Sequence, residues 1–244
     1  LLLWIFRMTQ KNTLLNIGDI DSSVIDTTGN SSIGYPQISI RVNRTAQRTD
    51  LQAVIDKGNS IADQYPDKTE RAEKVIEALN EMFGGGDFGH TWIIIFHSAT
   101  KGDYSTYAYH ETFGYVHDGD TDGQTNDTAD RGFGYEYITP ITQKIIQNME
   151  NSIIPQLNQE STAIGKTMGI TPTTGRQGVY TAITNCTWFG GNLFNTAMND
   201  TLVFTQKFDG ATYAQRWGID ALASITEIAD PGMIAESLAK RKQK

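Results

Sequence analysis

The chain has a single cysteine, Cys186, among its 244 residues. A lone thiol excludes an intramolecular disulfide framework and any zinc site built from several thiolates. Basic residues are also scarce, because 20 Lys and Arg stand against 28 Asp and Glu and leave a net charge of −8. This charge predicts no general attraction to nucleic acid or to an anionic membrane, although residues 240–244 form a short basic end.

Long hydrophobic runs are missing from the sequence as well. Residues 1–7 begin with six apolar residues that have no preceding basic region and no small-residue cleavage site. This run is too short to span a bilayer or to act as a signal peptide. No later run approaches the roughly 18 apolar residues that a membrane helix needs. We therefore expect no integral membrane segment and no signal peptide of the usual kind.

Helical and strand patterns alternate along the rest of the chain, which predicts an α+β fold. The predicted strands cover residues 37–42, 91–96, 104–110, 113–117, 134–139 and 179–184. The predicted helices cover residues 51–62, 67–83, 140–153, 186–198, 212–228 and 233–241. The stretch between the third and fourth of these helices, at residues 158–178, lacks periodicity and is interpreted as a long connection or lid. Residues 1–48 are a loop-rich lead-in to the same domain, which continues over residues 49–244.

Cys186 lies between a predicted strand and the first turn of a predicted helix. Unpaired amides at a helix N-terminus carry partial positive charge, which favours the thiolate and lowers the pKa of the thiol. The same amides can hold a developing oxyanion. Most lone cysteines are small buried hydrophobic residues, so a structural role stands beside the role of a nucleophile.

Two histidines strengthen the catalytic interpretation. His90 opens an apolar central strand, where an imidazole is costly unless it has a polar function. If residues 91–97 and 104–110 pair as a hairpin, His110 lies across from His90. Cys186, His90 and His110 then supply a nucleophile, a base and a group that orients the base. Taken singly, each histidine fits a structural or surface role better than a catalytic one.

Short motifs around these residues resemble a known superfamily. Residues 185–189, NCTWF, resemble the Asn-Cys-x-x-Phe signature of permuted NlpC/papain-like cysteine peptidases and amidases, a group that includes the lecithin:retinol acyltransferase-like proteins. Residues 89–93 and 106–110 resemble the histidine strand of that group and its return strand. The order also agrees, because histidine precedes cysteine in the permuted members. The resemblance covers roughly residues 85–118 and 178–199.

The resemblance implies a permuted papain-like fold in which a helix bearing Cys186 packs on an antiparallel sheet bearing His90 and His110, with additional helices. It also implies attack by the Cys186 thiolate on an acyl carbon, with His90 as base and then as acid, and with the Cys186 amide as an oxyanion donor. Members of the group usually carry the third polar residue closer to the histidine than twenty positions. The third role therefore also stays open to His97, Asp103 and Glu111.

The function implied by the resemblance is that of a cysteine amidase or endopeptidase, and the peptide amide bonds of bacterial peptidoglycan are the substrate we expect first. Such an enzyme without a usual signal peptide would suit an antibacterial toxin. It would be made in a bacterial cytoplasm, delivered by a specialised secretion apparatus into the periplasm of a target cell, and neutralised in the producer by a cognate immunity protein. The alternatives are a thiol acyltransferase or lipase-like enzyme and a catalytically inactive interaction module.

A second cluster of polar residues lies at residues 118–123. Asp118, Asp120 and Asp122 with a following glycine fit the opening of a calcium loop, in which alternate carboxylates meet one ion. The twelfth position of that loop is Ala129 instead of a bidentate glutamate. A solvated acidic surface loop is the alternative interpretation, and no other cofactor is expected.

Overall fold

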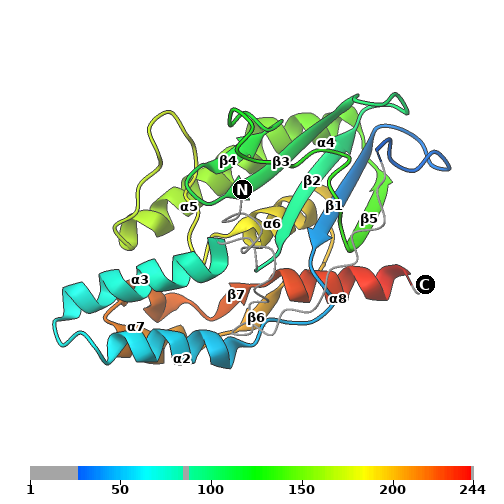
Figure 1. The fold of residues 1–244 in the computed structure, drawn as a ribbon. Coiled ribbons are helices and arrows are strands. Elements are labelled where there is room, and N and C mark those ends of the chain that lie inside the picture. The colour runs from blue at the N-terminus through cyan, green and yellow to red at the C-terminus, as the bar shows by residue number, and fades with distance from the viewer. Residues whose placement is uncertain (1–26, 85–87, 243–244) are drawn as a thin grey trace, which may run out of the picture.

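A five-stranded antiparallel sheet forms the centre of the computed structural model, which describes residues 27–84 and 88–242 (Figure 1). The strand order is β4-β3-β2-β1-β5. The strands are β1 (Gln37–Asn43), β2 (His90–Phe96), β3 (Tyr104–His110), β4 (Gly114–His117) and β5 (Tyr135–Pro140). The strand predicted at residues 37–42 is confirmed as β1. Although it belongs to the predicted lead-in, it lies between β2 and β5 in the sheet. The apolar run at residues 1–7 lies outside the described residues.

Helices pack against one face of this sheet and beside it, which confirms the α+β class. They are α2 (Leu51–Ala62), α3 (Lys68–Gly84), α4 (Gln143–Asn148), α5 (Ile154–Thr167), α6 (Cys186–Met198), α7 (Gly210–Trp217) and α8 (Pro231–Lys242). A π-helical turn, η1 (Met149–Ile153), joins α4 to α5, and a 3-10 turn, η2 (Asp220–Ser224), follows α7. A small second sheet pairs β6 (Thr205–Lys207) with β7 (Glu227–Ala229). Within the described ranges, no helix has the length and apolar character needed to cross a bilayer.

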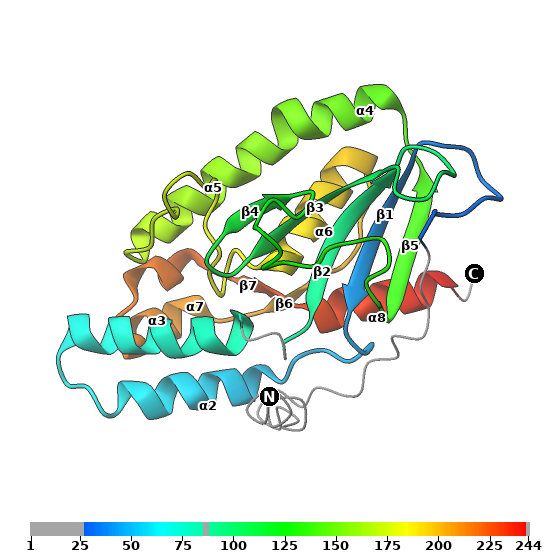
Figure 2. The ribbon, with the colours of Figure 1, turned by 45° about the horizontal axis from the view of Figure 1, so that its top comes forward.

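The two faces of the main sheet are covered differently. One face packs against α4, α5, α6 and α8, and Figure 2 shows α6 running behind the strands. The opposite face packs against the loop of residues 118–134, through Ala129 and Phe133. Along β2, Ile93 and Ile95 face the helices, while Trp92 and its alternate neighbours face the loop. This two-sided burial explains the continuous apolar run and confirms the prediction of a central strand.

The helices α2, α3 and α7 form a second layer beside the sheet (Figure 1). Asp50 caps α2 by accepting the Gln52 amide at 2.9 Å, and Asp67 accepts the Glu70 amide at 2.9 Å at the start of α3. Each helix therefore begins at an aspartate whose carboxylate satisfies an amide of its first turn. Gly58, a weak helix former in the middle of α2, allows close packing, because a Cβ there would lie 2.4 Å from the Trp217 ring.

Two predictions around residues 158–184 are wrong. The predicted connection is helical as far as Thr167. The buried face of α5 contains Asn158, Ser161 and Gly165 in place of large apolar residues, so the sequence shows no apolar helical period there. The predicted strand at residues 179–184 is instead a folded turn. The Thr181 hydroxyl accepts the amides of Ile183 and Thr184 at 3.1 and 3.0 Å, and this local bonding replaces a strand ladder.

The predicted helix at residues 212–228 is also too long. It ends at Trp217, because Gly218 adopts a left-handed conformation with φ of 76° and caps the helix C-terminus. The 3-10 turn η2 and strand β7 follow, and both were missed. The prediction for residues 186–198 is confirmed, since α6 covers Cys186–Met198.

Candidate active site

The N-terminus of α6 places Cys186 at the edge of the central sheet. Asn185 is the N-cap, and its side-chain oxygen accepts the amides of Thr187 and Trp188, both at 3.0 Å. This bonding uses two of the free amides of the first turn. The Cys186 amide makes no hydrogen bond within the described ranges, so it can donate to a substrate oxyanion.

Close contacts join this first turn to the start of β2. The thiol sulfur of Cys186 lies 3.9 Å from the carbonyl oxygen of Gly89, and the hydroxyls of Thr91 and Thr187 lie 2.9 Å apart. A Cβ at Gly190 would lie 2.9 Å from Cγ2 of Thr91. Gly190 thus allows α6 to pack closely against β2, and the cysteine lies next to the residue that precedes His90.

The sheet register brings the two predicted histidines together. Ile93 pairs with Tyr107 in the β2–β3 ladder, and the same register sets His90 across from His110. Their ring centroids lie 4.5 Å apart. The predicted hairpin is confirmed, and both imidazoles lie on neighbouring strands at the end of β2 nearest α6.

A carboxylate that the sequence analysis missed lies between these rings. Asp127 Oδ1 accepts a hydrogen bond from His90 Nε2 at 2.8 Å, and Oδ2 accepts one from His110 Nε2. Arg131 also donates to Oδ1 at 2.7 Å. The Asp127 side chain is 1% exposed. The group that contacts and orients His90 is therefore Asp127, and His110 holds the other oxygen of the same carboxylate.

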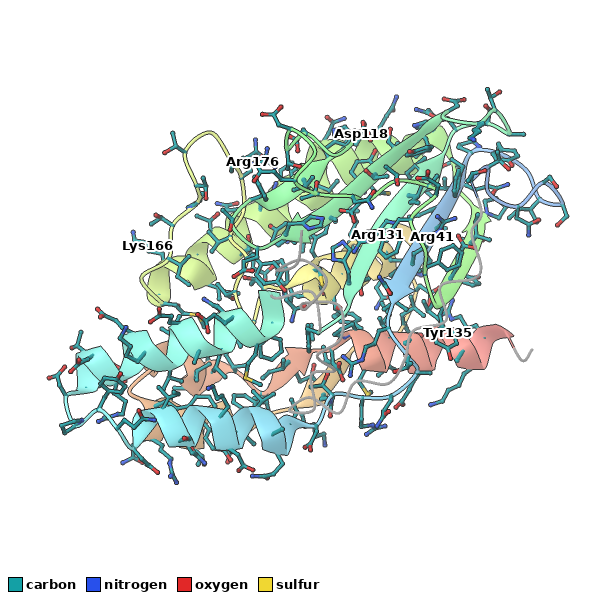
Figure 3. All side chains as sticks on the ribbon, viewed as in Figure 1. Arg41, Asp118, Arg131, Tyr135, Lys166 and Arg176 are labelled. Carbon is teal, nitrogen blue, oxygen red and sulfur yellow. The ribbon has the colours of Figure 1, made fainter. Side chains whose placement is uncertain are left out.

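The sequence carried only a weak signal for Asp127. The residue lies in the acidic loop that was interpreted as a solvated surface or a calcium site. Its pairing with Arg131 has i,i+4 spacing, which in isolation is typical of exposed ion pairs. The loop folds back over the sheet, and Figure 3 shows Arg131 in front of β2, with its guanidinium 5.0 Å from the Trp92 ring.

The carboxylate determines which nitrogen of His90 can act as a base. An ionised carboxylate only accepts, so Nε2 of each histidine carries the hydrogen. Burial lowers the pKa of His90 to about 4, and the nearby Arg131 and His110 add to this effect. The imidazole is therefore neutral at pH 7, with its lone pair on Nδ1. Burial alone would raise the pKa of Asp127, but the charge and hydrogen bonds of the two histidines hold it well below its usual value.

The Cys186 thiol is not activated in the way that the sequence predicted. Cys186 is 2% exposed, and this burial raises the pKa of its thiol. The amides of Thr91 and Thr187 oppose the rise without reversing it. The prediction of a lowered pKa is therefore wrong, because desolvation outweighs the helix N-terminus. The resting site holds a neutral thiol and a neutral imidazole.

A single pocket of about 110 Å³ connects the predicted site residues, and we call it the Cys186 pocket. Cys186, His90 and His110 all line it. The remaining lining residues are Asn43, Phe83, Gly89, Tyr109, Glu111, Arg131 and Tyr180. A thiol, a neutral base and a buried carboxylate that orients the base thus converge on a space that admits a small part of a substrate.

The other residues considered for the third role lie in two places. His97 contacts the Ser105 hydroxyl at 3.0 Å, and Asp103 accepts from the Ser98 hydroxyl at 2.5 Å. Both belong to the turn between β2 and β3, at the end of the hairpin opposite His90 and His110. Glu111 directly follows His110 and lines the Cys186 pocket.

His90, His110 and Asp127 also have the chemistry of a metal site. One ligand atom from each lies within 4.8 Å of the others, and this is the one such group among the residues that the structure describes. Two features oppose a cation there. Both Nε2 atoms already donate hydrogen to Asp127, and the Arg131 guanidinium brings a positive charge to the same carboxylate. The arrangement fits an orienting carboxylate better than a metal ligand.

Two of the three aspartates of the calcium hypothesis have partners of their own. Asp118 accepts the Thr106 amide at 2.7 Å, and Asp120 forms an ion pair with Arg176 at 3.1 Å. Figure 3 shows Asp118 and Arg176 at the β4 side of the molecule. Asp118, Asp120 and Asp122 do not form a ligand cluster in the described part of the chain.

No protein-family model, curated protein or solved structure matches this chain. We therefore infer the function from the geometry of the Cys186 pocket and from the short motifs at residues 89–93, 106–110 and 185–189.

Proposed function

We propose that the protein is a cysteine hydrolase that cleaves amide bonds, with Cys186 as the nucleophile and His90 as the general base. The observation that carries this proposal is that both residues line one pocket while Asp127 binds Nε2 of His90 and leaves Nδ1 for the reaction. His110 and Arg131 act as positioning residues, because each contacts the Asp127 carboxylate.

The neutral resting pair defines the order of proton movements. Nδ1 of His90 takes the thiol proton as the sulfur of Cys186 attacks the carbonyl carbon and the C=O electron pair moves to oxygen. The Cys186 amide donates to this oxyanion. When the C–N bond breaks, the amine takes the proton from Nδ1, and water later hydrolyses the thioester with His90 again as the base. Asp127 stabilises the imidazolium formed in each half-reaction.

For the substrate, we propose the peptide stems of bacterial peptidoglycan, and for the biological role an antibacterial toxin with a cognate immunity protein. The resemblance of the motifs around His90 and Cys186 to permuted NlpC/papain-like enzymes supports both. A second candidate, an inactive interaction module, is supported by the 2% exposure of Cys186 and the raised pKa of its thiol.

Product analysis separates these functions. Purified peptidoglycan fragments and, separately, a phospholipid are incubated with the protein and analysed by mass spectrometry. We expect fragments with new amino and carboxyl termini from the wild-type protein and none from Cys186→Ala, with an unchanged circular dichroism spectrum. His97→Gln is the matched control, because this histidine lies at the far end of the hairpin, and it should retain activity.

Three outcomes of this experiment contradict the proposal. A released fatty acid without peptide cleavage would identify a lipase-like enzyme. No product from either substrate would favour the interaction module. Full activity in Cys186→Ala would exclude the assigned nucleophile.

A further inference from the structure

The charged groups of the Cys186 pocket are unequally neutralised. Arg131 is paired with Asp127 at 2.7 Å. Glu111, at the start of the turn between β3 and β4, has no ion pair and no hydrogen bond in the part of the chain that the structure describes. Glu111 is an exposed residue, and its partial burial raises the pKa of its carboxyl group, which the carboxylate of Glu81 on α3 raises further. The pocket therefore contains one carboxylate without a positive partner, beside a second negative charge.

A second, independent feature of the pocket is an acceptor without a donor. Asn43 is the last residue of β1 and pairs with His90 in the sheet register. Its side-chain oxygen is buried and accepts no hydrogen bond from the described residues. A buried polar atom without a hydrogen-bond partner costs free energy. The unsatisfied oxygen of Asn43 therefore favours a ligand that can donate a hydrogen bond to it.

The other polar groups that line the pocket already have partners. The Tyr180 hydroxyl donates to the carbonyl of Phe83 at 2.7 Å, and the Tyr109 hydroxyl donates to Asn158 at 2.7 Å. His110 donates to Asp127. Apart from Nδ1 of the two imidazoles, the unsatisfied hydrogen-bonding capacity of the pocket side chains therefore lies in two acceptors, Glu111 and Asn43.

We propose that Glu111 and Asn43 form a subsite that recognises a cationic nitrogen group of the substrate, such as a primary ammonium or a guanidinium. This inference rests on the proposed function, because it assigns the substrate class of the same pocket. A cationic N–H group pairs with the Glu111 carboxylate and donates to Asn43. A carboxylate or phosphate in this position would be repelled by Glu111, and an alkyl chain would leave both acceptors unpaired.

The charge preference can be measured without knowing the substrate. The full protein is treated at pH 7 with two thiol reagents of similar length, 2-aminoethyl and 2-sulfonatoethyl methanethiosulfonate. The sulfur of Cys186 attacks the sulfenyl sulfur, a mixed disulfide forms and methanesulfinate leaves. We divide the rate with the aminoethyl reagent by the rate with the sulfonatoethyl reagent, and then divide this quotient by the same quotient for a free small thiol. The resulting relative ratio reports the charge that the pocket presents.

We expect this relative ratio to exceed one, to fall with added salt and to decrease about threefold or more in Glu111→Gln. In Asn43→Ala we expect a slower reaction with the aminoethyl reagent. Glu73→Gln is the matched control. It also removes one negative charge, but Glu73 lies on α3 and lines a different pocket, so the ratio should be unchanged.

The outcomes distinguish this inference from the proposed function. A reactive Cys186 whose relative ratio is one or less, or is unchanged in Glu111→Gln, would overturn the cationic subsite and leave the cysteine hydrolase in place. A thiol that reacts with neither reagent would contradict the proposed function and remove the inference with it.

Discussion

Two carboxylates of low exposure lie against the same sheet and serve different purposes: the Asp127 side chain is 1% exposed and the Glu136 side chain 12%. Asp127 pairs with Arg131 at 2.7 Å, and Glu136 pairs with Arg41 at 2.8 Å. Glu136 also accepts from the Ser39 hydroxyl at 2.6 Å, so its other described partner is a group that stays neutral. Asp127 instead contacts two imidazoles at a pocket that contains a thiol. A buried ion pair becomes part of a reactive site when one of its members also orients a group that can exchange a proton.

The largest expected difference between the two carboxylates is in catalysis. Asp127→Asn loses the ionised acceptor that fixes the hydrogen of His90 on Nε2, and we expect hydrolysis to slow by about 10⁴-fold, the scale seen when the carboxylate of a catalytic triad is replaced by its amide. Glu136→Gln is the isosteric control and should retain activity within about threefold. Equal losses in the two variants, measured by product formation, would remove the distinction.

The second contrast concerns stability. Arg41 is fully buried and stacks 4.3 Å from the Phe133 ring, so Arg41→Met leaves the Glu136 carboxylate without its cationic partner and with the Ser39 hydroxyl alone. Loss of one partner from a buried pair lowers the free energy of unfolding by about 3–5 kcal/mol. Urea denaturation measures this change. The double variant Arg41→Met with Glu136→Gln should recover part of the loss, and a single variant within 1 kcal/mol of wild type would contradict a structural role for the pair.

A smaller effect tests how α6 is held against β2. Gly190→Ala brings a Cβ to within 2.9 Å of Cγ2 of Thr91, and overpacking of this kind costs about 1–3 kcal/mol. Thr91→Ser removes that methyl group and keeps the hydroxyl that contacts Thr187. We expect the double variant to regain stability and activity relative to Gly190→Ala. An additive loss in the double variant would place the strain elsewhere.

The smallest effect is the pH dependence of stability caused by His90. Its pKa is about 4 in the folded protein and near 6.5 when unfolded, so the unfolded chain binds the proton first as the pH falls. The stabilisation is complete above pH 6.5 and is lost toward pH 4. Between pH 7 and pH 5.5 the loss is about 1 kcal/mol, and His90→Gln should lack it. Parallel curves of unfolding free energy against pH for the two proteins would contradict the lowered pKa.

The contrast between the two carboxylates also shows what the sequence could and could not predict. The apolar run of β2 predicted that this strand lies in the centre of the sheet. The hairpin that it forms with β3 predicted that His90 and His110 lie close together. Local patterns were sufficient there because alternation and a short turn define the register. The position of Asp127 depends on how the whole loop of residues 118–134 crosses the sheet, and no local pattern encodes that path.

The same limit explains why the predicted lowering of the pKa of Cys186 is wrong. Its position at the first turn of α6 was evident from the sequence, and a helix N-terminus alone favours the thiolate. The burial that reverses this effect arises when Gly190 allows α6 to approach Thr91, a contact between segments about a hundred positions apart. Tertiary packing therefore decided the protonation state.

The most direct test of the account is the rate at which iodoacetamide alkylates Cys186 at pH 7 in the wild-type protein and in His90→Gln. Burial raises the pKa of the thiol, and in the proposed mechanism Nδ1 of His90 removes its proton. We expect alkylation in His90→Gln to be slower by about tenfold or more, with His97→Gln unchanged. Equal rates in the wild-type protein and His90→Gln would show that the imidazole does not act on the thiol and would contradict the proposed mechanism.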